Sequence, residues 1–334
     1  GTGADAVAYV LSLMEVARVC VSHAITVSVT NMVCESIHRF GTSKQRAKYI
    51  PRFTSGEYLA GAFCLTEPGS GSDAGSLRAT ADLDGTHYVL NGTKIFITNG
   101  MYGGVYMVAA RTDKDAGKRG ISVFLVEPDT PGVHIGRKEE KLGQRGSDTV
   151  EILLENCRVP VENILGNPGD GFKIMLSALD GGRVGVAATS CGLARGALEA
   201  AISYAKERKQ FGKAIGEFEL IQAKLADLYA SLQAARALVY DVASRYDGSR
   251  AMRKDAAACL MFAANAAMPA LLDTLQMLGG RGYLNESPAG RLLRDAKVYQ
   301  IGGGTDEIRH IVIGRELFAE SRPAAEVAPA ARQA

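Results

Sequence analysis

The chain of 334 residues has no tryptophan and few residues of the types that build metal or disulfide sites. Its six cysteines are widely spaced and form no CxxC pair, which predicts reduced thiols in a cytosol-type compartment rather than disulfides or a zinc site. The five histidines form no HExxH motif, which argues against a metal enzyme. Thirty-eight Lys and Arg against thirty-six Asp and Glu leave a charge of +2 without a basic stripe, so no nucleic-acid partner is expected.

Long hydrophobic runs are also missing. The longest apolar stretch, residues 256–272, is rich in alanine and is interrupted by Asn265 and Pro269. It is shorter than the ~20 residues that span a bilayer, so we expect a helix buried in a bundle and no membrane span. No signal peptide opens the sequence. It begins with Gly1 in the middle of a helical pattern, and we expect the N-terminal part of the fold to be incomplete.

The composition that is present, 47% hydrophobic and 22% charged, is typical of a globular protein and excludes a disordered chain. The length suggests about two domains. Apolar residues in segment 4–56, such as Val10 and Met14, recur at helical spacing. Ser43 is the candidate N-cap of a second helix over residues 43–53.

From about residue 60 to 165, turn residues and β-branched runs dominate. Residues 77–98 are a hairpin candidate, with turns predicted at Asp84-Gly85 and Asn91-Gly92. The short connections predict a β domain of antiparallel character. Further strands are predicted over 105–111, 121–127, 133–137 and 149–154.

Beyond Gly171 the apolar period becomes helical, and the pattern predicts an antiparallel bundle. The predicted helices cover 172–208, 218–246, 252–278, 289–299 and 305–318. The fold class is therefore α+β and multidomain: truncated N-terminal helices, a middle antiparallel β domain and a C-terminal antiparallel four-helix bundle. The predicted domains are 1–58, 59–167 and 168–320, followed by a disordered tail over 321–334.

The loop 64–76 is the densest functional candidate. Its glycines have the wrong spacing for a dinucleotide fingerprint, and a strand hairpin follows where a helix would be needed. The loop offers bare backbone N–H groups and the hydroxyls of Thr66, Ser70 and Ser72, which suit an anionic or ring-shaped polar ligand. A plain β-turn loop explains the same composition.

Three consecutive glycines, Gly302 to Gly304, precede a helix whose N-cap would be Thr305. Asp306 and Glu307 complement the helix dipole. The segment is either a simple helix start or a place where a ligand approaches bare backbone at a helix N-terminus. Three glycines carry a conformational entropy cost, which favours the second interpretation.

Two longer motifs carry a family resemblance. Residues 64–76 are similar to the signature Leu-Thr-Glu-Pro-x-x-Gly-Ser-Asp, and residues 276–295 are similar to a second signature of the same family. In this order and with this helix–strand–helix layout, the chain resembles the acyl-CoA dehydrogenase family of flavoproteins from about residue 9 to 315. The segment 178–183 is most like the short-chain and branched-chain members.

The resemblance implies FAD as cofactor, an acyl-CoA as substrate and an electron-transferring flavoprotein as electron acceptor. It also implies a homodimer or homotetramer, because part of the cofactor site would serve a neighbouring subunit. The residues implied at the cofactor are Phe63, Cys64, Leu65, Thr66, Gly71, Ser72, Phe96, Ile97, Thr98, Arg208, Phe211, Gln276, Met277, Leu278, Gly279, Gly280, Thr305, Asp306 and Glu307. Those implied at the substrate are Ser72, Asp180, Arg183 and Gly303.

The implied reaction removes a proton from Cα and passes a hydride from Cβ to the flavin N5 atom. Family members polarise the thioester carbonyl in an oxyanion-hole arrangement that includes one backbone N–H, here that of Gly303. A glutamate then takes the proton. This chain has Gly303 at one position that the family uses for that glutamate and Gly182 at the other. The catalytic base is therefore unassigned.

Three interpretations follow. The first is α,β-dehydrogenation of a short- or branched-chain acyl-CoA with a base that the sequence does not identify. The second is the same scaffold with chemistry that needs no Cα base, such as desulfination. The third is a non-catalytic partner subunit that binds FAD and CoA. The expected location is the cytoplasm, or the mitochondrial matrix in a eukaryote.

Overall fold

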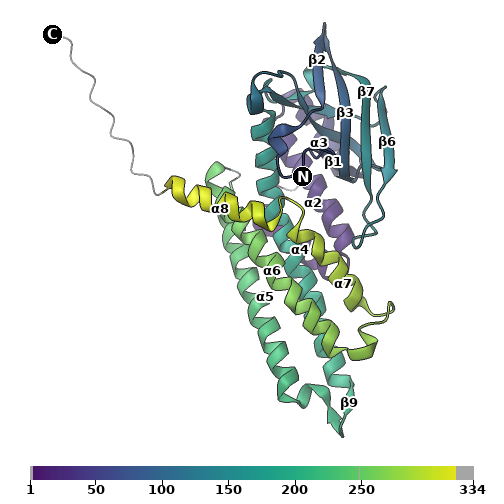
Figure 1. Ribbon diagram of the computed structural model, residues 1–334, viewed down its shortest axis with the longest axis vertical. Coiled ribbons are helices and arrows are strands. Elements are labelled where there is room, and N and C mark those ends of the chain that lie inside the picture. The colour runs from purple at the N-terminus through teal and green to yellow at the C-terminus, as the bar shows by residue number, and fades with distance from the viewer. Residues whose placement is uncertain (1–2, 248, 321–334) are drawn as a thin grey trace, which may run out of the picture.

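The computed structural model describes residues 3–247 and 249–320, and the predicted disordered tail lies outside them. Three N-terminal helices, a β domain and a helical bundle follow one another along the chain (Figure 1). The helices are α1 (Ala6–Val19), α2 (Val21–Phe40), α3 (Ser43–Thr54), α4 (Gly171–Glu207), α5 (Glu219–Arg245), α6 (Arg253–Met277), α7 (Pro288–Lys297) and α8 (Asp306–Glu320). The strands are β1 (Ala60–Cys64), β2 (Thr80–Asp84), β3 (His87–Thr98), β4 (Gly103–Arg111), β5 (Ile121–Val126), β6 (Val133–Lys138), β7 (Thr149–Pro160), β8 (Ile164–Leu165), β9 (Lys209–Gln210) and β10 (Lys213–Ala214).

The N-terminal segment forms three helices rather than two, because the chain leaves helical geometry at Cys20. The predicted N-cap Ser43 is wrong: Thr42 caps α3. The Thr42 hydroxyl accepts from the Gln45 N–H at 3.2 Å, and the Gln45 side chain accepts from the Thr42 N–H at 2.9 Å. This reciprocal capping box satisfies two N–H groups that the helix leaves open.

The middle domain is one main sheet with the order β6-β7-β3-β2-β4-β5-β8, and β1 pairs with β4. Most pairs are antiparallel, as predicted, although β1 and β2 each run parallel to β4. The predicted turn at Asn91-Gly92 is wrong, because both residues lie inside β3 at a register shift. A Cβ on Gly92 would lie 2.6 Å from the Ala79 Cβ, so this bulge requires glycine.

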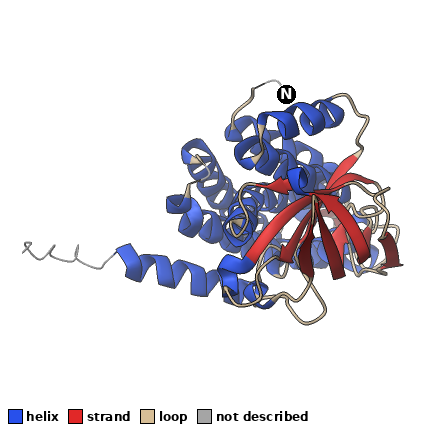
Figure 2. Cartoon of the chain, turned by 90° about the horizontal axis from the view of Figure 1, so that it is seen from above, coloured by secondary structure: helices blue, strands red, loops and turns tan. Residues whose placement is uncertain are grey.

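The helices α4, α5, α6 and α7 run alternately up and down as the predicted antiparallel bundle, and α8 crosses one of its ends (Figure 1). Seen from above, the bundle and the N-terminal helices lie beside the sheet (Figure 2). One apolar core joins α1 to the bundle, and a second joins α2, α3 and the start of α4 to the sheet. The α4 helix therefore belongs to both cores.

In the described part of the chain, the α6 helix is long and apolar enough to cross a membrane by length and composition alone. Half of its most apolar window is buried inside the molecule. Leu260, Ala264 and Leu271 belong to the bundle core. This packing agrees with the predicted buried helix.

Candidate active site

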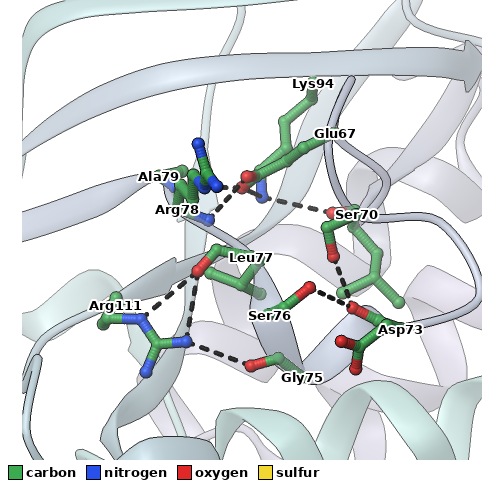
Figure 3. Close-up of polar contacts among 11 residues, drawn as sticks. Glu67, Ser70, Asp73, Gly75, Ser76, Leu77, Arg78, Ala79, Lys94 and Arg111 are labelled. Carbon is green, nitrogen blue, oxygen red and sulfur yellow. Dashed lines mark hydrogen bonds and ion pairs between the residues drawn. The ribbon is translucent and has the colours of Figure 1, made fainter.

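The loop that follows β1 is ordered by hydrogen bonds within itself and to β4, which a plain β-turn would not have (Figure 3). Glu67 and Ser70 pair through two backbone hydrogen bonds of 3.0 and 3.1 Å, and the Ser70 hydroxyl donates to the Asp73 carbonyl at 2.7 Å. The Arg111 guanidinium of β4 donates to the carbonyls of Gly75 and Leu77, each at 3.1 Å. These bonds fix the course of the loop from both of its ends.

A buried ion pair joins this loop to β3 (Figure 3). The Lys94 ammonium donates to Glu67 Oε1 at 2.7 Å and to the Leu65 carbonyl at 3.2 Å, and the Lys94 side chain has no exposed surface. The Glu67 carboxylate also accepts from the backbone N–H groups of Arg78 at 2.6 Å and Ala79 at 3.0 Å. Burial alone would raise the pKa of Glu67, but the Lys94 charge and these hydrogen bonds hold it below its usual range.

The ion pair places the end of β3 beside the end of β1, and the Ile95 N–H donates to the Thr66 carbonyl at 2.9 Å. Phe96 is 60% exposed, and Thr66 and Thr98 are partly exposed. The exposure of Phe96 has a local cause: its φ is +57°, and the register of β3 shifts between Lys94 and Ile97. The strand therefore turns one aromatic face outward while Lys94 stays buried.

The structure divides the residues predicted here into two kinds. The side chains of Cys64, Leu65 and Ile97 are buried in the apolar cores, so they can meet a ligand only through their backbone atoms. Gly71 and Ser72 are exposed, and a Cβ on Gly71 would meet nothing within 4 Å.

An accessible aromatic ring, two threonine hydroxyls and an unobstructed Gly/Ser loop match a ligand with a flat polar ring and a phosphate chain. These residues therefore fit FAD.

The three-glycine loop lies between α7 and α8 and is held by two buried arginines. Arg309 donates to the Gly302 carbonyl at 2.6 Å, and Arg183 Nε donates to the Gly303 carbonyl at 3.0 Å. Gly303 has φ +71° and Gly304 has φ +92°, conformations that L side chains rarely adopt. In the described part of the chain, no group accepts a hydrogen bond from the Gly303 N–H.

Asp180 and Arg183 form a buried ion pair. Arg183 is 5% exposed and donates to Asp180 Oδ1 at 2.7 Å, while Arg253 of α6 approaches Asp180 Oδ2 at 3.3 Å. Burial lowers the pKa of Arg183, and the Asp180 charge opposes that shift. The pair joins α4, α6 and the glycine loop, and its predicted contact with CoA stays a prediction.

The two positions that the family uses for a glutamate differ in their surroundings. On α4, a Cβ on Gly182 would lie 2.5 Å from the Met32 sulfur atom. In the loop, a Cβ on Gly303 would lie 3.7 Å from Leu260 Cδ2, an ordinary contact distance. Neither glycine supplies a carboxylate, so the structure leaves the base unassigned.

The remaining predicted cofactor residues form two further groups. Thr305, Asp306 and Glu307 begin α8, where the Thr305 hydroxyl accepts from the Ile308 N–H at 3.4 Å and Asp306 pairs with Arg309 at 2.5 Å.

The second group lies at the end of the bundle that is far from the sheet, around the β9–β10 hairpin and the end of α6 (Figure 1). Phe211 is 95% exposed, and Met277 and Leu278 are buried. One chain alone therefore does not bring this group to the β1–β3 surface. The group comprises Arg208, Phe211, Gln276, Met277, Leu278, Gly279 and Gly280.

The residues that hold the site together are not among those predicted from the sequence. Lys94 is a charged residue within the apolar end of β3, and Arg309 is a charged residue within α8. Each could have indicated a side chain that is paired with another group inside the protein. Asp295 ends the second signature, and its carboxylate accepts from the Gln144 N–H at 2.5 Å in the β6–β7 connection. A cavity of about 500 Å³ beside that connection is lined mainly by charged residues such as Lys138 and Arg145.

In the described residues, the cysteines form no disulfide and the possible metal ligands form no metal site. All six cysteines are free thiols, and burial raises the pKa of Cys191 to about 12. Among residues 3–247 and 249–320, no three side chains of the His, Cys, Asp and Glu types come together as a metal site.

The chain matches models of one protein family along most of its length. Three family models match it in order: acyl-CoA dehydrogenase N-terminal domain over residues 1–57, middle domain over 62–157 and C-terminal domain over 169–318. The chain therefore belongs to the acyl-CoA dehydrogenase family, a family of oxidoreductases whose members use FAD.

Individual relatives agree with this assignment. An acyl-CoA dehydrogenase of Bacillus subtilis is 47% identical over 95% of this chain and 84% of its own length. A mitochondrial isovaleryl-CoA dehydrogenase of Oryza sativa is 44% identical over 96% of this chain and 78% of its own length. The solved butyryl-CoA dehydrogenase of Megasphaera elsdenii superposes with a TM-score of 0.92 at 42% identity, covering 95% of this chain and 83% of that one. The fold is that of the family.

Proposed function

We propose that this chain binds FAD and the CoA thioester of a short or branched acyl group and oxidises the Cα–Cβ bond to the 2-enoyl-CoA. The observation that carries the proposal is the surface at the ends of β1 and β3, where Thr66, Phe96 and Thr98 are accessible. The buried Lys94–Glu67 ion pair beneath this surface connects β3 to the loop after β1. Bound FAD would supply the acceptor for the hydride that leaves Cβ.

The chain's own part in the reaction begins with the thioester carbonyl. The N–H of Gly303 has no acceptor in the described part of the chain, so it is available to a substrate oxygen. A hydrogen bond to that oxygen stabilises the enolate that forms when Cα loses its proton, and such a donor is worth roughly 10²–10³-fold in rate. This is the step that Gly303 serves without a side chain.

Proton removal is the step for which this chain has no assigned residue. Gly182 and Gly303 occupy the two positions at which the family resemblance places the glutamate. Loss of a general base costs roughly 10²–10⁴-fold. We therefore expect oxidation that is slow compared with that of a relative that keeps the glutamate.

The test is an anaerobic titration of FAD-loaded protein with butyryl-CoA and isobutyryl-CoA, followed at the visible flavin band. Bleaching in proportion to added acyl-CoA supports dehydrogenation, and the faster substrate identifies the acyl class. A spectral shift without bleaching shows binding without this chemistry. No change with either substrate overturns the proposal.

A second candidate function follows from the missing base, since Gly182 and Gly303 carry no carboxylate and a Cβ on Gly182 would lie 2.5 Å from the Met32 sulfur atom. The same scaffold would then bind acyl-CoA and FAD but carry out chemistry without a Cα base, such as desulfination, or act as a non-catalytic partner subunit. Release of sulfite from an acyl-CoA with a β-sulfinate group would support desulfination. Binding without any turnover, together with activation of a catalytic partner, would support the subunit.

The oligomer and the electron acceptor complete the proposal. The cofactor residues around Arg208 and Phe211 lie at the far end of the bundle (Figure 1), so we propose a homodimer or homotetramer in which they hold the FAD of a neighbouring copy. The proposed acceptor is an electron-transferring flavoprotein, and the proposed location is the cytoplasm, or the mitochondrial matrix in a eukaryote. Mass measurement in solution and steady-state reduction of a purified acceptor test these points.

A further inference from the structure

The buried Arg309 side chain forms hydrogen bonds to the glycine loop from the interior of the protein. It has no exposed surface. One of its terminal nitrogens donates to the Gly302 carbonyl at 2.6 Å and the Tyr299 carbonyl at 2.8 Å, and the other donates to Asp306 Oδ1 at 2.5 Å. A single planar guanidinium therefore joins the end of α7, the loop and the start of α8.

One of these bonds has a direct geometric consequence for Gly303. The Gly302 carbonyl and the Gly303 N–H belong to the same peptide unit, and the described chain contains no cis peptide bond. In a planar trans peptide the C=O and N–H point in opposite directions. When Arg309 holds the carbonyl on the buried side, it turns the Gly303 N–H away from the guanidinium, and in the described residues that N–H finds no acceptor.

Arg183 holds the next peptide unit in the same way, through the Gly303 carbonyl at 3.0 Å. Three consecutive glycines have more backbone freedom than any other tripeptide, so an unsupported loop would populate many orientations of this N–H. Two buried guanidinium groups on successive carbonyls remove that freedom before any ligand arrives. Such preorganisation is what makes an oxyanion donor effective.

We propose that Arg309 is a positioning residue for the thioester carbonyl: by holding the Gly302 carbonyl, it orients the Gly303 N–H toward the substrate oxygen. This inference rests on the proposed acyl-CoA site. Arg309 itself touches no ligand, because its side chain is buried among the loop, the end of α7 and the start of α8. Its effect on the reaction passes entirely through one peptide unit.

The experiment compares the R309M and R309K variants with the native protein and with R315M, a control at an exposed arginine of the same helix. The readout is isotope-edited infrared spectroscopy of bound crotonyl-CoA labelled at its carbonyl carbon. A polarised carbonyl absorbs at lower frequency than the same group in water. FAD content and melting temperature are measured in parallel to show that each variant is folded.

We expect the native protein and R315M to lower the carbonyl frequency equally. In R309M the frequency should return toward its value in solution, with crotonyl-CoA affinity changed only a few-fold and flavin reduction by butyryl-CoA slowed about 10²-fold. R309K keeps a positive charge beside Asp306 but lacks the planar fork, so it should fold and still lose most of the shift. It decides the outcome if R309M does not fold.

Equal shifts in the native protein and a folded R309K or R309M would overturn the role of Arg309. Absence of any shift in the native protein with bound crotonyl-CoA would overturn the role of the Gly303 N–H as well. A native protein that binds no crotonyl-CoA would refute the proposed acyl-CoA site, and the inference with it. A native protein that shows the shift but no flavin reduction would refute dehydrogenation alone and leave the positioning role supported.

Discussion

Gly182 and Gly303 stand at the two positions where a glutamate base is expected, and they differ in what excludes a side chain. Gly182 lies within the long helix α4, so its backbone suits any L residue, but its Cβ would meet the Met32 sulfur at 2.5 Å. Gly303 has room for a Cβ but has φ +71°. A flexible thioether can move aside at little cost, whereas a left-handed backbone cannot relax without moving the loop. The helix position is therefore the better place to restore a carboxylate.

The largest effect is expected from G182E. A restored carboxylate should speed flavin reduction by butyryl-CoA or isobutyryl-CoA by roughly 10²–10⁴-fold, the usual contribution of a general base. Rapid-mixing measurement of flavin bleaching checks this, with G182Q as the control of equal size and no carboxylate. Equal rates for the two variants, both with bound FAD, would show that the missing carboxylate does not limit this protein.

The next largest effect is the change in the free energy of unfolding when Met32 is truncated, with glycine or glutamate at position 182. Because Met32 is 8% exposed, M32A should destabilise the native protein by roughly 2–5 kcal/mol through the cavity it leaves. In the G182E background the glutamate occupies part of that space, so the cost should fall by about 0.5–3 kcal/mol. Denaturant unfolding of the four proteins gives the coupling. Strict additivity would mean that Met32 and residue 182 do not compete for the same space.

A smaller effect is expected at the loop. G303E should lower stability by roughly 1–2 kcal/mol because an L side chain must adopt φ near +71°, and its gain in rate should be below that of G182E. G303N serves as control, since asparagine tolerates the left-handed region better than glutamate. Thermal unfolding and flavin bleaching are measured together. A G303E rate above that of G182E would reverse the comparison between the two positions.

The smallest effects are expected from alanine at the two positions, because alanine tests the backbone conformation without adding a carboxylate. G182A gains helix propensity of about 1 kcal/mol and loses part of it by displacing the Met32 sulfur, so its stability should change by less than about 1 kcal/mol. G303A should be destabilised by more than G182A, because alanine at position 303 must adopt φ near +71°. Its Cβ would meet no neighbour closer than 3.7 Å, so this backbone strain is the whole of the effect. Melting temperatures of the two variants show whether the order holds.

The sequence predicted the elements well where one period dominates. The bundle helices begin and end within two residues of the predicted bounds because their apolar faces repeat over many turns. The turn predicted at Asn91-Gly92 was wrong because the same dipeptide occurs in hairpin turns and in bulges, and only the close approach of Ala79 distinguishes the two. The break at Cys20 has no glycine or proline to mark it.

The site was predicted as a set of residues but not as a geometry. The motifs named the loop 64–76 and the missing glutamate. They could not show that Phe96 adopts φ +57° or that the Gly303 N–H has no acceptor. A lone charge within a strand or a helix indicates that Lys94 and Arg309 have partners, but it does not show that these are Glu67 and the carbonyls of Tyr299 and Gly302.

The Lys94–Glu67 pair also bears on how the site opens. Lys94 Nζ donates to a Glu67 carboxylate oxygen and to the Leu65 carbonyl in the loop after β1, and the neighbouring Ile95 N–H donates to the Thr66 carbonyl of the same loop. Neither segment can separate from the other without stranding a buried charge. The two should therefore exchange their amide hydrogens as one cooperative unit, at a free energy near that of global unfolding, although loops elsewhere on the surface open independently. The surface at which we propose FAD binds therefore keeps its shape without needing a ligand to order it.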